Sequence, residues 1–287
     1  MRVGVVILPT DPWPAAAATW RRAEELGFDS AWVYDHVRWR GLPDSPWLDA
    51  FSTLAAVAAI TERIRIGPMV TTPNFRHPVP TAKAAVAIDR ISGGRLELGI
   101  GAGGTPPDAT VLGGPAPAPR ERAGRLVEWV ELLDRLLRRD ETTFAGPRWS
   151  AEAAWMSPGC VQRPRVPFGI AATGSRGMAL AARLGEAWVT DARGGPAVAA
   201  EQVVRLGDAC AAAGRDPGSI RRIALTGRSE RPLNSLEAFR DVAGRYREAG
   251  VTEILLHWPR SEEPHRANIG ILEQIAADLP PPTVRAD

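Results

Sequence analysis

An aspartate and a histidine stand next to each other where a predicted strand ends. The segment 28–36 is a short apolar run that finishes in Asp35 and His36. A neutral imidazole in this place can hydrogen-bond a heterocycle or relay a proton, and an adjacent carboxylate can bias its tautomer. In the alternative interpretation, Asp35 caps a helix and backbone groups hold a partly buried histidine. We treat His36 and Asp35 as candidate catalytic residues.

A glycine cluster ends another short apolar run. Residues 95–104 read RLELGIGAGG, and glycine allows a backbone to approach a flat or anionic ligand and to adopt positive φ without strain. A dinucleotide fingerprint uses similar residues, but the next helical pattern begins only near Pro119, so no helix N-terminus stands directly behind the glycines to bind a pyrophosphate. The cluster instead predicts the floor of a different cofactor site, formed by Gly101, Ala102, Gly103 and Gly104.

The third predicted strand ends in two apolar residues followed by two threonines. Thr71 and Thr72 offer hydroxyls to the polar edge of a ring, while Met69 and Val70 can support the face of that ring. Ordinary packing with a rigid exit turn explains the same residues. We include all four among the candidate cofactor contacts.

The fifth predicted strand runs into a helix through Thr173, Gly174 and Ser175. Hydroxyls and free backbone N–H groups at a helix N-terminus form a phosphate cradle, to which Arg176 can add positive charge. A plain helix cap needs only one of these residues, so we favour the phosphate-binding interpretation. Thr190, at the end of the next strand, is placed to contact the tail of the same ligand.

Aromatic side chains and a second histidine mark the expected substrate side. His257 and Trp258 end the last predicted strand, where a substrate contact and a pair that caps the core are equally good explanations. Trp39, Trp47 and Trp155 are expected to surround the substrate, which would then be apolar or flat. Aromatic residues also pack cores and subunit contacts, so this second interpretation stays open.

Short apolar runs alternate with longer amphipathic segments, a pattern typical of βα units and a parallel sheet. The predicted strands are residues 2–8, 30–34, 64–69, 96–100, 168–172, 187–190, 220–225 and 253–257. The predicted helices are residues 14–26, 51–60, 80–91, 120–138, 176–184, 196–213, 236–249 and 273–279. Eight strands that are each followed by a helix predict a (β/α)8 TIM barrel of the α/β class. Its active site would lie at the C-terminal strand ends, and residues 1–287 would form one domain.

Residues 140–167 interrupt this alternation. They hold four prolines, two tryptophans and little periodicity. A loop this long within a compact domain is usually a lid or a binding loop, so we predict a short lid insertion here. The proline-rich end, residues 280–287, is expected to be a flexible tail.

The composition excludes several classes of function. The 287 residues carry a net charge of +2, which gives no basis for binding nucleic acid or an acidic membrane surface. The two cysteines are isolated and the four histidines are scattered, so we expect neither a disulfide framework nor a metal site. No apolar run approaches the roughly 18 residues that a membrane span needs, and we expect a cytoplasmic protein.

Taken together, these segments resemble the bacterial-luciferase-like family of flavin- and F420-dependent oxidoreductases. The matching segments are residues 27–36, 76–78, 89–103, 121–126, 162–164 and 173–185. They cover most of residues 1–195 in the expected order, while the last third fits only by pattern. Such proteins are TIM barrels that bind FMN or the deazaflavin F420 at the strand C-termini, and many of them are dimers. The resemblance therefore implies one of these cofactors, with F420 favoured over FMN, and a homodimer.

The resemblance also assigns roles to particular residues. The bond between Met69 and Val70 matches a non-proline cis peptide that lies behind the deazaflavin ring. The family's pair near the reactive ring is matched by Asp35 and His36, and its phosphate-contacting positions by Gly174 and Ser175.

One departure from the family bears on the activity. Sugar-phosphate dehydrogenases of this family carry a glutamate directly after the glycine strand as proton donor or base, and this chain has Gly104 there. We therefore do not expect that activity, and His36 is our first choice for the acid. We expect hydride transfer between F420 and a small organic substrate. The alternatives are an FMN-dependent monooxygenase that uses reduced flavin and oxygen, and a barrel that binds a flavin without catalysis.

Overall fold

Eight parallel strands form one sheet in the computed structural model, which describes residues 1–104, 106–227 and 230–280. The strands lie side by side in the order β3-β2-β1-β10-β9-β8-β7-β4. Their bounds are β1 (Arg2–Val6), β2 (Ser30–Val33), β3 (Arg65–Pro68), β4 (Leu98–Gly101), β7 (Phe168–Ala171), β8 (Ala187–Thr190), β9 (Arg221–Leu225) and β10 (Glu253–His257). The outermost two, β3 and β4, are joined by backbone hydrogen bonds at both ends, so the sheet closes into a barrel.

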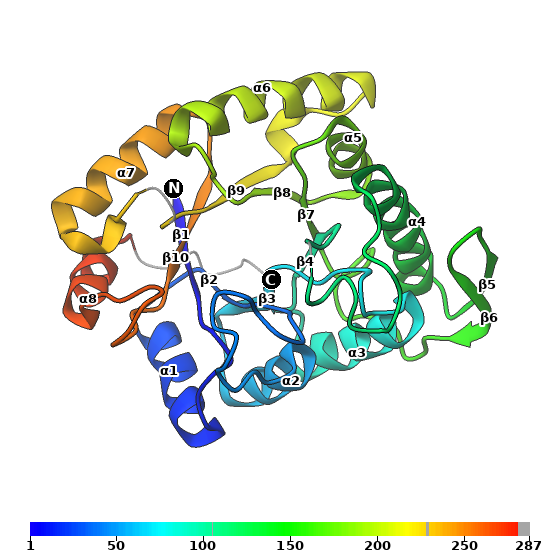
Figure 1. Cartoon of the computed structure of the whole chain (residues 1–287), viewed down its shortest axis with the longest axis horizontal. Helices are drawn as coiled ribbons and strands as arrows, with labels where there is room; N and C mark the ends of the chain where they lie inside the picture. Colours follow the sequence, from blue (N-terminus) through cyan, green and yellow to red (C-terminus); the bar gives the residue numbers. More distant parts are fainter. Residues whose placement is uncertain (105, 228–229, 281–287) are drawn as a thin grey trace.

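Helices alternate with the strands and surround the barrel (Figure 1). They are α1 (Trp13–Glu25), α2 (Ala50–Ile60), α3 (Pro78–Ile91), α4 (Pro119–Arg138), α5 (Ser175–Leu184), α6 (Gly195–Ala212), α7 (Leu236–Glu248) and α8 (Ile269–Asp278). Two short 3-10 helices, Pro217–Ser219 and Pro232–Asn234, precede β9 and α7. The predicted (β/α)8 barrel is confirmed, and β8 and β10 have the predicted bounds.

The chain comes very close to itself where β3 meets β4. A Cβ atom on Gly67 would lie 2.0 Å from the carbonyl oxygen of Glu97, and one on Gly99 would lie 2.3 Å from that of Pro68. Real Cβ atoms essentially never approach backbone atoms so closely, so both positions require glycine. The two strands that carry the predicted cofactor floor therefore meet in a seam where two glycines allow the backbones to come this close.

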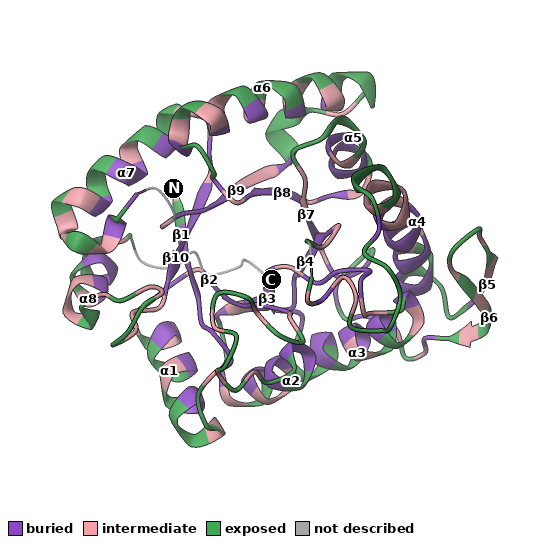
Figure 2. Ribbon diagram, in the orientation of Figure 1, coloured by how far each residue is buried: buried purple, intermediate pink, exposed green. Residues whose placement is uncertain are grey.

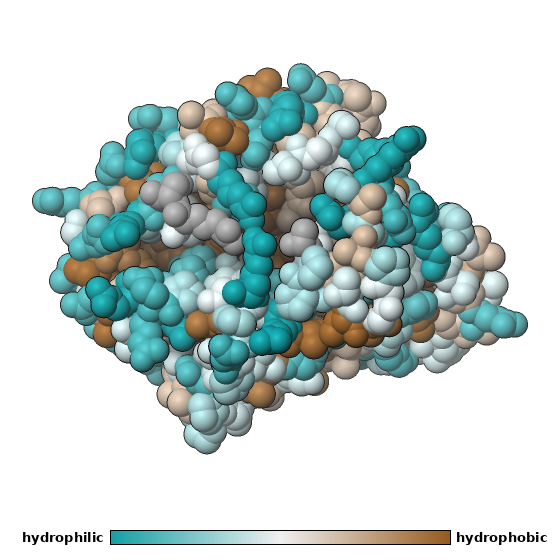
Figure 3. Space-filling model, in the orientation of Figure 1, coloured by the Kyte–Doolittle hydropathy of each residue, from teal (hydrophilic) through white to brown (hydrophobic). Residues whose placement is uncertain are grey.

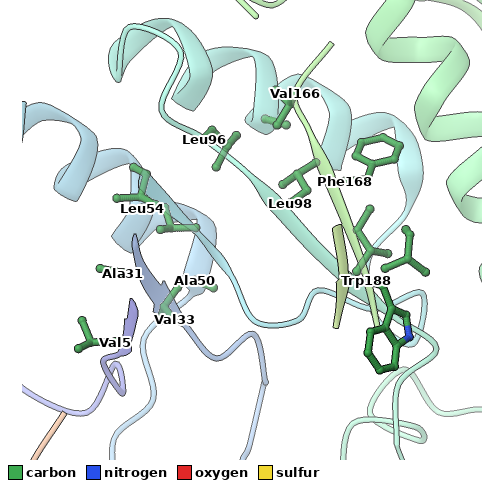
Figure 4. Close-up of a cluster of buried hydrophobic side chains, with 14 of the residues drawn as sticks. Val5, Ala31, Val33, Ala50, Leu54, Leu96, Leu98, Val166, Phe168 and Trp188 are labelled. Carbon is green, nitrogen blue, oxygen red and sulfur yellow. The ribbon is translucent and has the colours of Figure 1, made fainter. Parts of the chain in front are cut away.

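Apolar side chains fill two layers of the barrel. The larger layer lies between strands and helices, and Figure 4 shows part of it, with Leu54 of α2, Leu98 of β4 and Phe168 of β7. The smaller layer lies inside the barrel, because strand side chains alternate between the two faces: Val5 belongs to the outer layer and Val6 to the inner one. Figure 2 agrees with this arrangement, since the strands are buried and the helices turn exposed faces outward.

Ion pairs fill the barrel at the N-terminal ends of its strands. Arg221, at the start of β9, pairs with Glu97 and, at 2.8 Å, with Glu253 at the start of β10. The Ser30 hydroxyl donates to the Glu253 carboxylate at 2.7 Å, and burial raises the pKa of that carboxyl. This end is opposite to the one where TIM barrels carry their chemistry, so the cluster serves stability.

The insertion at residues 140–167 is present, but it is not a lid. It forms an antiparallel hairpin of β5 (Glu141–Ala145) and β6 (Ser150–Trp155), which lies beyond α4 at the side of the barrel (Figure 1). The Trp149 indole donates to the Arg125 carbonyl of α4 at 3.3 Å, and Lys83 of α3 donates to the Trp155 carbonyl at 3.0 Å. The hairpin therefore packs on the outer side of two helices.

Two further observations concern the chain as a whole. Among the described residues, no helix combines the length and the apolar character that crossing a membrane requires. The predicted tail, residues 280–287, lies outside the described residues from position 281 onward.

Candidate active site

A cavity of about 1020 Å³ opens at the C-terminal ends of the strands. The residues that line it follow β2, β3, β4, β7 and β8, so widely separated segments converge there. Figure 3 shows that hydrophilic side chains cover most of the face viewed in Figure 1, with hydrophobic atoms in patches between them. Predicted site residues that line the cavity are Asp35, His36, Trp39, Met69, Val70, Thr72, Gly101, Ala102, Gly103, Gly104, Thr173, Gly174, Ser175 and Arg176.

The floor of the cavity is built from the ends of β3 and β4. The peptide bond between Met69 and Val70 is cis, as the family resemblance implies. A Cβ on Gly101 would lie 2.6 Å from Cγ2 of Val70. Gly103 has φ +76°, and a Cβ there would lie 2.3 Å from both the Thr72 hydroxyl and the Asn74 amide nitrogen. Glycine is therefore required at both positions, where the ends of β3 and β4 meet.

Two buried polar groups at this floor have no hydrogen-bond partner among the described residues. They are the Thr71 hydroxyl and the Asn74 amide nitrogen, and Asn74 also lines the cavity. Buried donors in proteins are nearly always paired, and leaving one unpaired costs about 1–3 kcal/mol. A ring with acceptor atoms at its edge would satisfy the Asn74 amide. The residues present thus fit a planar heterocyclic cofactor.

His36 is held by a carboxylate from a different part of the chain. Its Nδ1 lies 2.5 Å from Oδ2 of Asp108, in the loop between β4 and α4. The other oxygen, Oδ1, accepts from the backbone N–H groups of Val37 and Arg38 at 3.1 and 3.2 Å. Because the carboxylate accepts at Nδ1, the second ring nitrogen, Nε2, is the one free to exchange a proton.

Asp35 does not contact His36. Both of its oxygens accept from Arg76, each at 2.6 Å, and the same guanidinium donates to Asp49 at 2.6 Å. Burial lowers the pKa of Arg76, but the two carboxylates outweigh that effect and raise it. The Asp35 side chain is fully buried, so this aspartate anchors the loop after β3. The carboxylate that orients the imidazole is therefore not the one predicted.

The opposite wall offers positive charge and unpaired backbone donors. Helix α5 begins at Ser175 after the exposed Gly174, and no side chain caps its first N–H groups. Such a helix start attracts an anion through its dipole and its free N–H groups. Six arginines line the cavity: Arg176 at this helix start, Arg193 after β8, Arg120 and Arg122 at the start of α4, and Arg38 and Arg40 on the side of His36. The cavity is therefore suited to a ligand that carries phosphate or carboxylate groups.

Five predicted site residues do not line this cavity, in addition to Thr71. The Thr190 hydroxyl is buried and donates at 2.7 Å to Oε1 of Gln202, a residue that itself lines the cavity. Trp47 packs against His36 and Trp39, with ring centroids 6.0 and 5.7 Å away. The others are His257, which lines a neighbouring cavity of about 560 Å³, Trp258, which packs against the core, and Trp155, which is 57% exposed on the outer hairpin. The prediction that Trp155 surrounds the substrate is therefore wrong.

Sequence reasoning missed Asp108, Asn74 and the arginines at the start of α4. Asn74 follows the predicted threonine pair closely and could have been found by extending that strand end. Asp108 is a single acid in a long loop, and no local pattern distinguishes it. Within the described ranges, no cluster of three or more histidine, cysteine, aspartate or glutamate residues could hold a metal ion.

Comparison with known proteins gives a consistent result. A family model of luciferase-like monooxygenases matches residues 1–229. An uncharacterized protein of Mycobacterium tuberculosis is 30% identical over 297 aligned positions, which cover 97% of this chain and 99% of the relative. The F420-dependent glucose-6-phosphate dehydrogenase of Amycolatopsis mediterranei is 36% identical over 173 positions, which cover 58% of this chain and 50% of that enzyme. The chain thus aligns with only about half the length of that dehydrogenase.

Solved structures share the fold. An F420-dependent secondary alcohol dehydrogenase in complex with an F420–acetone adduct superposes with a TM-score of 0.84 at 20% identity, over 96% of this chain and 97% of that one. The monooxygenase RslO1 of Streptomyces bottropensis superposes with a TM-score of 0.67 at 26% identity, over 87% of this chain and 78% of that one. An F420-dependent alcohol dehydrogenase and a monooxygenase therefore both have this fold.

Proposed function

The chain belongs to the luciferase-like monooxygenase family, and within that family we propose that it is an F420-dependent oxidoreductase that transfers a hydride to or from a small organic molecule. The observation that carries the proposal is the single cavity that joins a glycine floor, an uncapped helix start and a carboxylate-held histidine. The sequence similarity to an F420-dependent dehydrogenase supports F420 over FMN.

The residues of the cavity fit the parts of such a cofactor. Met69 and Val70 would support one face of the deazaflavin ring, and the unpaired Asn74 amide would bond its polar edge. The helix start at Ser175 would hold the phosphate. F420 continues beyond its phosphate into a chain that bears carboxylates. The arginines that line the cavity have the complementary charge. FMN ends at its phosphate and would leave those arginines unused.

The protein contributes placement and proton handling. Bound F420 supplies or accepts the hydride at its ring. Nε2 of His36 gives or takes the proton at the substrate's reacting oxygen or nitrogen, since Nδ1 is engaged by Asp108. Trp39 and the loop residues Pro106 and Pro107 line the same cavity and would offer apolar surface beside the cofactor ring.

The substrate is proposed to be small and apolar or flat, and not a sugar phosphate. Gly104 carries no carboxylate, and no described residue beyond its chain neighbours lies within 4 Å of the place that a Cβ would take there. Trp47 contacts both the His36 ring and the Trp39 ring, so the two tryptophans place an aromatic surface beside the proton-transfer group. A flat or apolar substrate would be covered by that surface.

Fluorescence titration of the cofactor-free protein with F420 and with FMN tests this proposal. We expect F420 to bind at least about tenfold more tightly, a difference of about 1.4 kcal/mol. Gly103→Ala should weaken F420 binding, because its Cβ would displace Thr72 and Asn74. The matched control is Gly207→Ala in α6, where a Cβ meets nothing within 4 Å. If both cofactors bind more weakly than about 1 mM, the proposal is wrong.

The reaction itself separates the remaining alternatives. Oxidation of reduced F420 by ketones, enones or imines without oxygen supports the proposed activity. Oxygen consumption with reduced FMN would instead assign a monooxygenase, the activity named for the RslO1 structure. Tight cofactor binding without turnover on any such substrate would assign a barrel that only binds the cofactor.

A further inference from the structure

We propose that Asp108 is the positioning residue of the site. It fixes the tautomer of His36 in which Nδ1 carries the hydrogen and Nε2 can exchange a proton. It also makes this tautomer depend on the position of the loop between β4 and α4. The catalytic consequence rests on the proposed function, whereas the tautomer itself is a property of the protein alone.

The geometry assigns each oxygen of Asp108 its own task. Oδ2 lies 2.5 Å from Nδ1 of His36, and an ionised carboxylate can only accept a hydrogen bond there. Oδ1 accepts two backbone N–H groups, from Val37 at 3.1 Å and Arg38 at 3.2 Å. The Asp108 side chain is 8% exposed and the His36 side chain 33%, so the carboxylate is sheltered while the ring keeps access to the cavity.

No other group among the described residues accepts at Nδ1 of His36. Asp35, the neighbour in sequence, has both oxygens bound to Arg76. The Tyr34 and Trp47 rings meet the imidazole edge to face, with centroids 5.9 and 6.0 Å away, and these contacts do not select a tautomer. The tautomer is therefore set by a residue 72 positions away in the sequence.

This arrangement couples two loops to one proton. Asp108 stands in the loop after β4, whereas His36, Val37 and Arg38 belong to the loop after β2. All three bonds form only when the first loop lies against the second. The imidazole is consequently held in the tautomer for proton transfer only while the loop after β4 lies against the loop after β2. A carboxylate on the same strand as the histidine would not create this dependence.

Asp108→Asn separates the two tasks of this residue. Two backbone donors face Oδ1, so the amide oxygen should keep that place and the amide NH2 should replace Oδ2. Nδ1 would then have to accept a hydrogen bond, and His36 should change to the tautomer with hydrogen on Nε2. Asp108→Ala removes both sets of bonds. Asp44→Asn is the matched control, because Asp44 is an exposed acid of the loop that carries His36, and its one ion pair among the described residues is with Arg38.

Long-range 1H–15N NMR of the cofactor-free protein at alkaline pH reads the tautomer directly. The chain has four histidines, so the signals of His36 can be assigned from their loss in His36→Gln. We expect a protonated Nδ1 in the wild type and in Asp44→Asn, and a protonated Nε2 in Asp108→Asn. A protonated Nδ1 in Asp108→Asn would overturn the proposal. Thermal melting shows that each variant is folded, and the isosteric Asp108→Asn keeps the test open if Asp108→Ala does not fold.

Kinetics with reduced F420 then test the consequence for catalysis. We expect Asp108→Asn to lower kcat at least about tenfold, within the usual contribution of general acid–base catalysis, while the F420 dissociation constant changes less than about twofold. An unchanged kcat together with a changed tautomer would overturn the catalytic part. If the wild type binds no F420, the proposed function fails, and the NMR result still decides the positioning role.

Discussion

Arg76→Leu should destabilise the protein far more than loss of an ordinary surface arginine. Arg76 donates two hydrogen bonds of 2.6 Å to Asp35, whose side chain is fully buried, and one to Asp49, whose side chain is 45% exposed. The guanidinium also lies over the Phe51 ring at 4.5 Å, a cation–π contact that leucine cannot make. The variant therefore removes the charge, the hydrogen bonds and this contact, while leucine keeps part of the apolar volume of the side chain.

The expected magnitude follows from the difference between the two carboxylates. Asp49 regains water when Arg76 is removed, so its pair contributes about 0–1 kcal/mol. Asp35 has no access to water and would remain as an uncompensated charge, which costs about 3–5 kcal/mol. At about 2–4 °C per kcal/mol for a domain of this size, the melting temperature should fall by about 10 °C. Asp35→Asn alone should cost about 1–3 kcal/mol, because Arg76 keeps its bond to Asp49.

Thermal and urea unfolding of four proteins check this reasoning. They are the wild type, the two single variants and the double variant Asp35→Asn/Arg76→Leu. The double variant should recover part of the stability lost in Arg76→Leu, because no buried charge remains. Arg240→Leu, which breaks an exposed pair with Asp278, is the matched control and should melt close to the wild type. If Arg76→Leu melts like this control, or if the double variant is less stable than either single one, the buried-charge argument is refuted.

Two further predictions concern the insertion and acid stability. Trp155→Ala should leave F420 affinity unchanged while Trp39→Ala weakens it, because only Trp39 lines the cavity; equal losses in a fluorescence titration would contradict the placement of the hairpin. Burial opposes ionisation of Glu24, but backbone N–H groups of residues 62–64 outweigh it and lower the pKa of its carboxyl. A lowered pKa stabilises the folded state above the unfolded value of about 4.3, and this contribution is lost as the pH falls through the folded pKa. The stability advantage of the wild type over Glu24→Gln, measured by urea unfolding, should therefore shrink between about pH 5 and pH 3, and a constant advantage would contradict it.

The barrel could be predicted because its signal is local. Each strand is a short buried run, and each helix between two strands has the amphipathic spacing that covers a barrel, so the alternation alone fixes the topology. The β5–β6 hairpin could not be predicted in this way. Its β6 residues are mostly exposed and alternate poorly, and what holds it in place is contact with α3 and α4.

The position of the candidate site could be expected for a similar reason. The C-terminal ends of parallel strands share one rim of the barrel, so chemistry-bearing residues at those ends must converge. Adjacency in the sequence did not show which carboxylate meets His36, because successive side chains at a strand end point to opposite sides. The Asp35 carboxylate binds Arg76, while the His36 ring meets Asp108. The true partner, Asp108, is brought near only by folding.

The glycine seam between β3 and β4 limits how this scaffold can acquire new specificities. Alanine at Gly67 or Gly99 would force a Cβ to within 2.0 or 2.3 Å of a facing carbonyl oxygen, so β3 and β4 cannot vary independently at these positions. Changes in the shape of the cavity have to come from the loops that border it, around Trp39 and Pro107. Libraries that randomise those two loops but keep the seam, His36 and Asp108 would sample new pockets without unfolding the barrel.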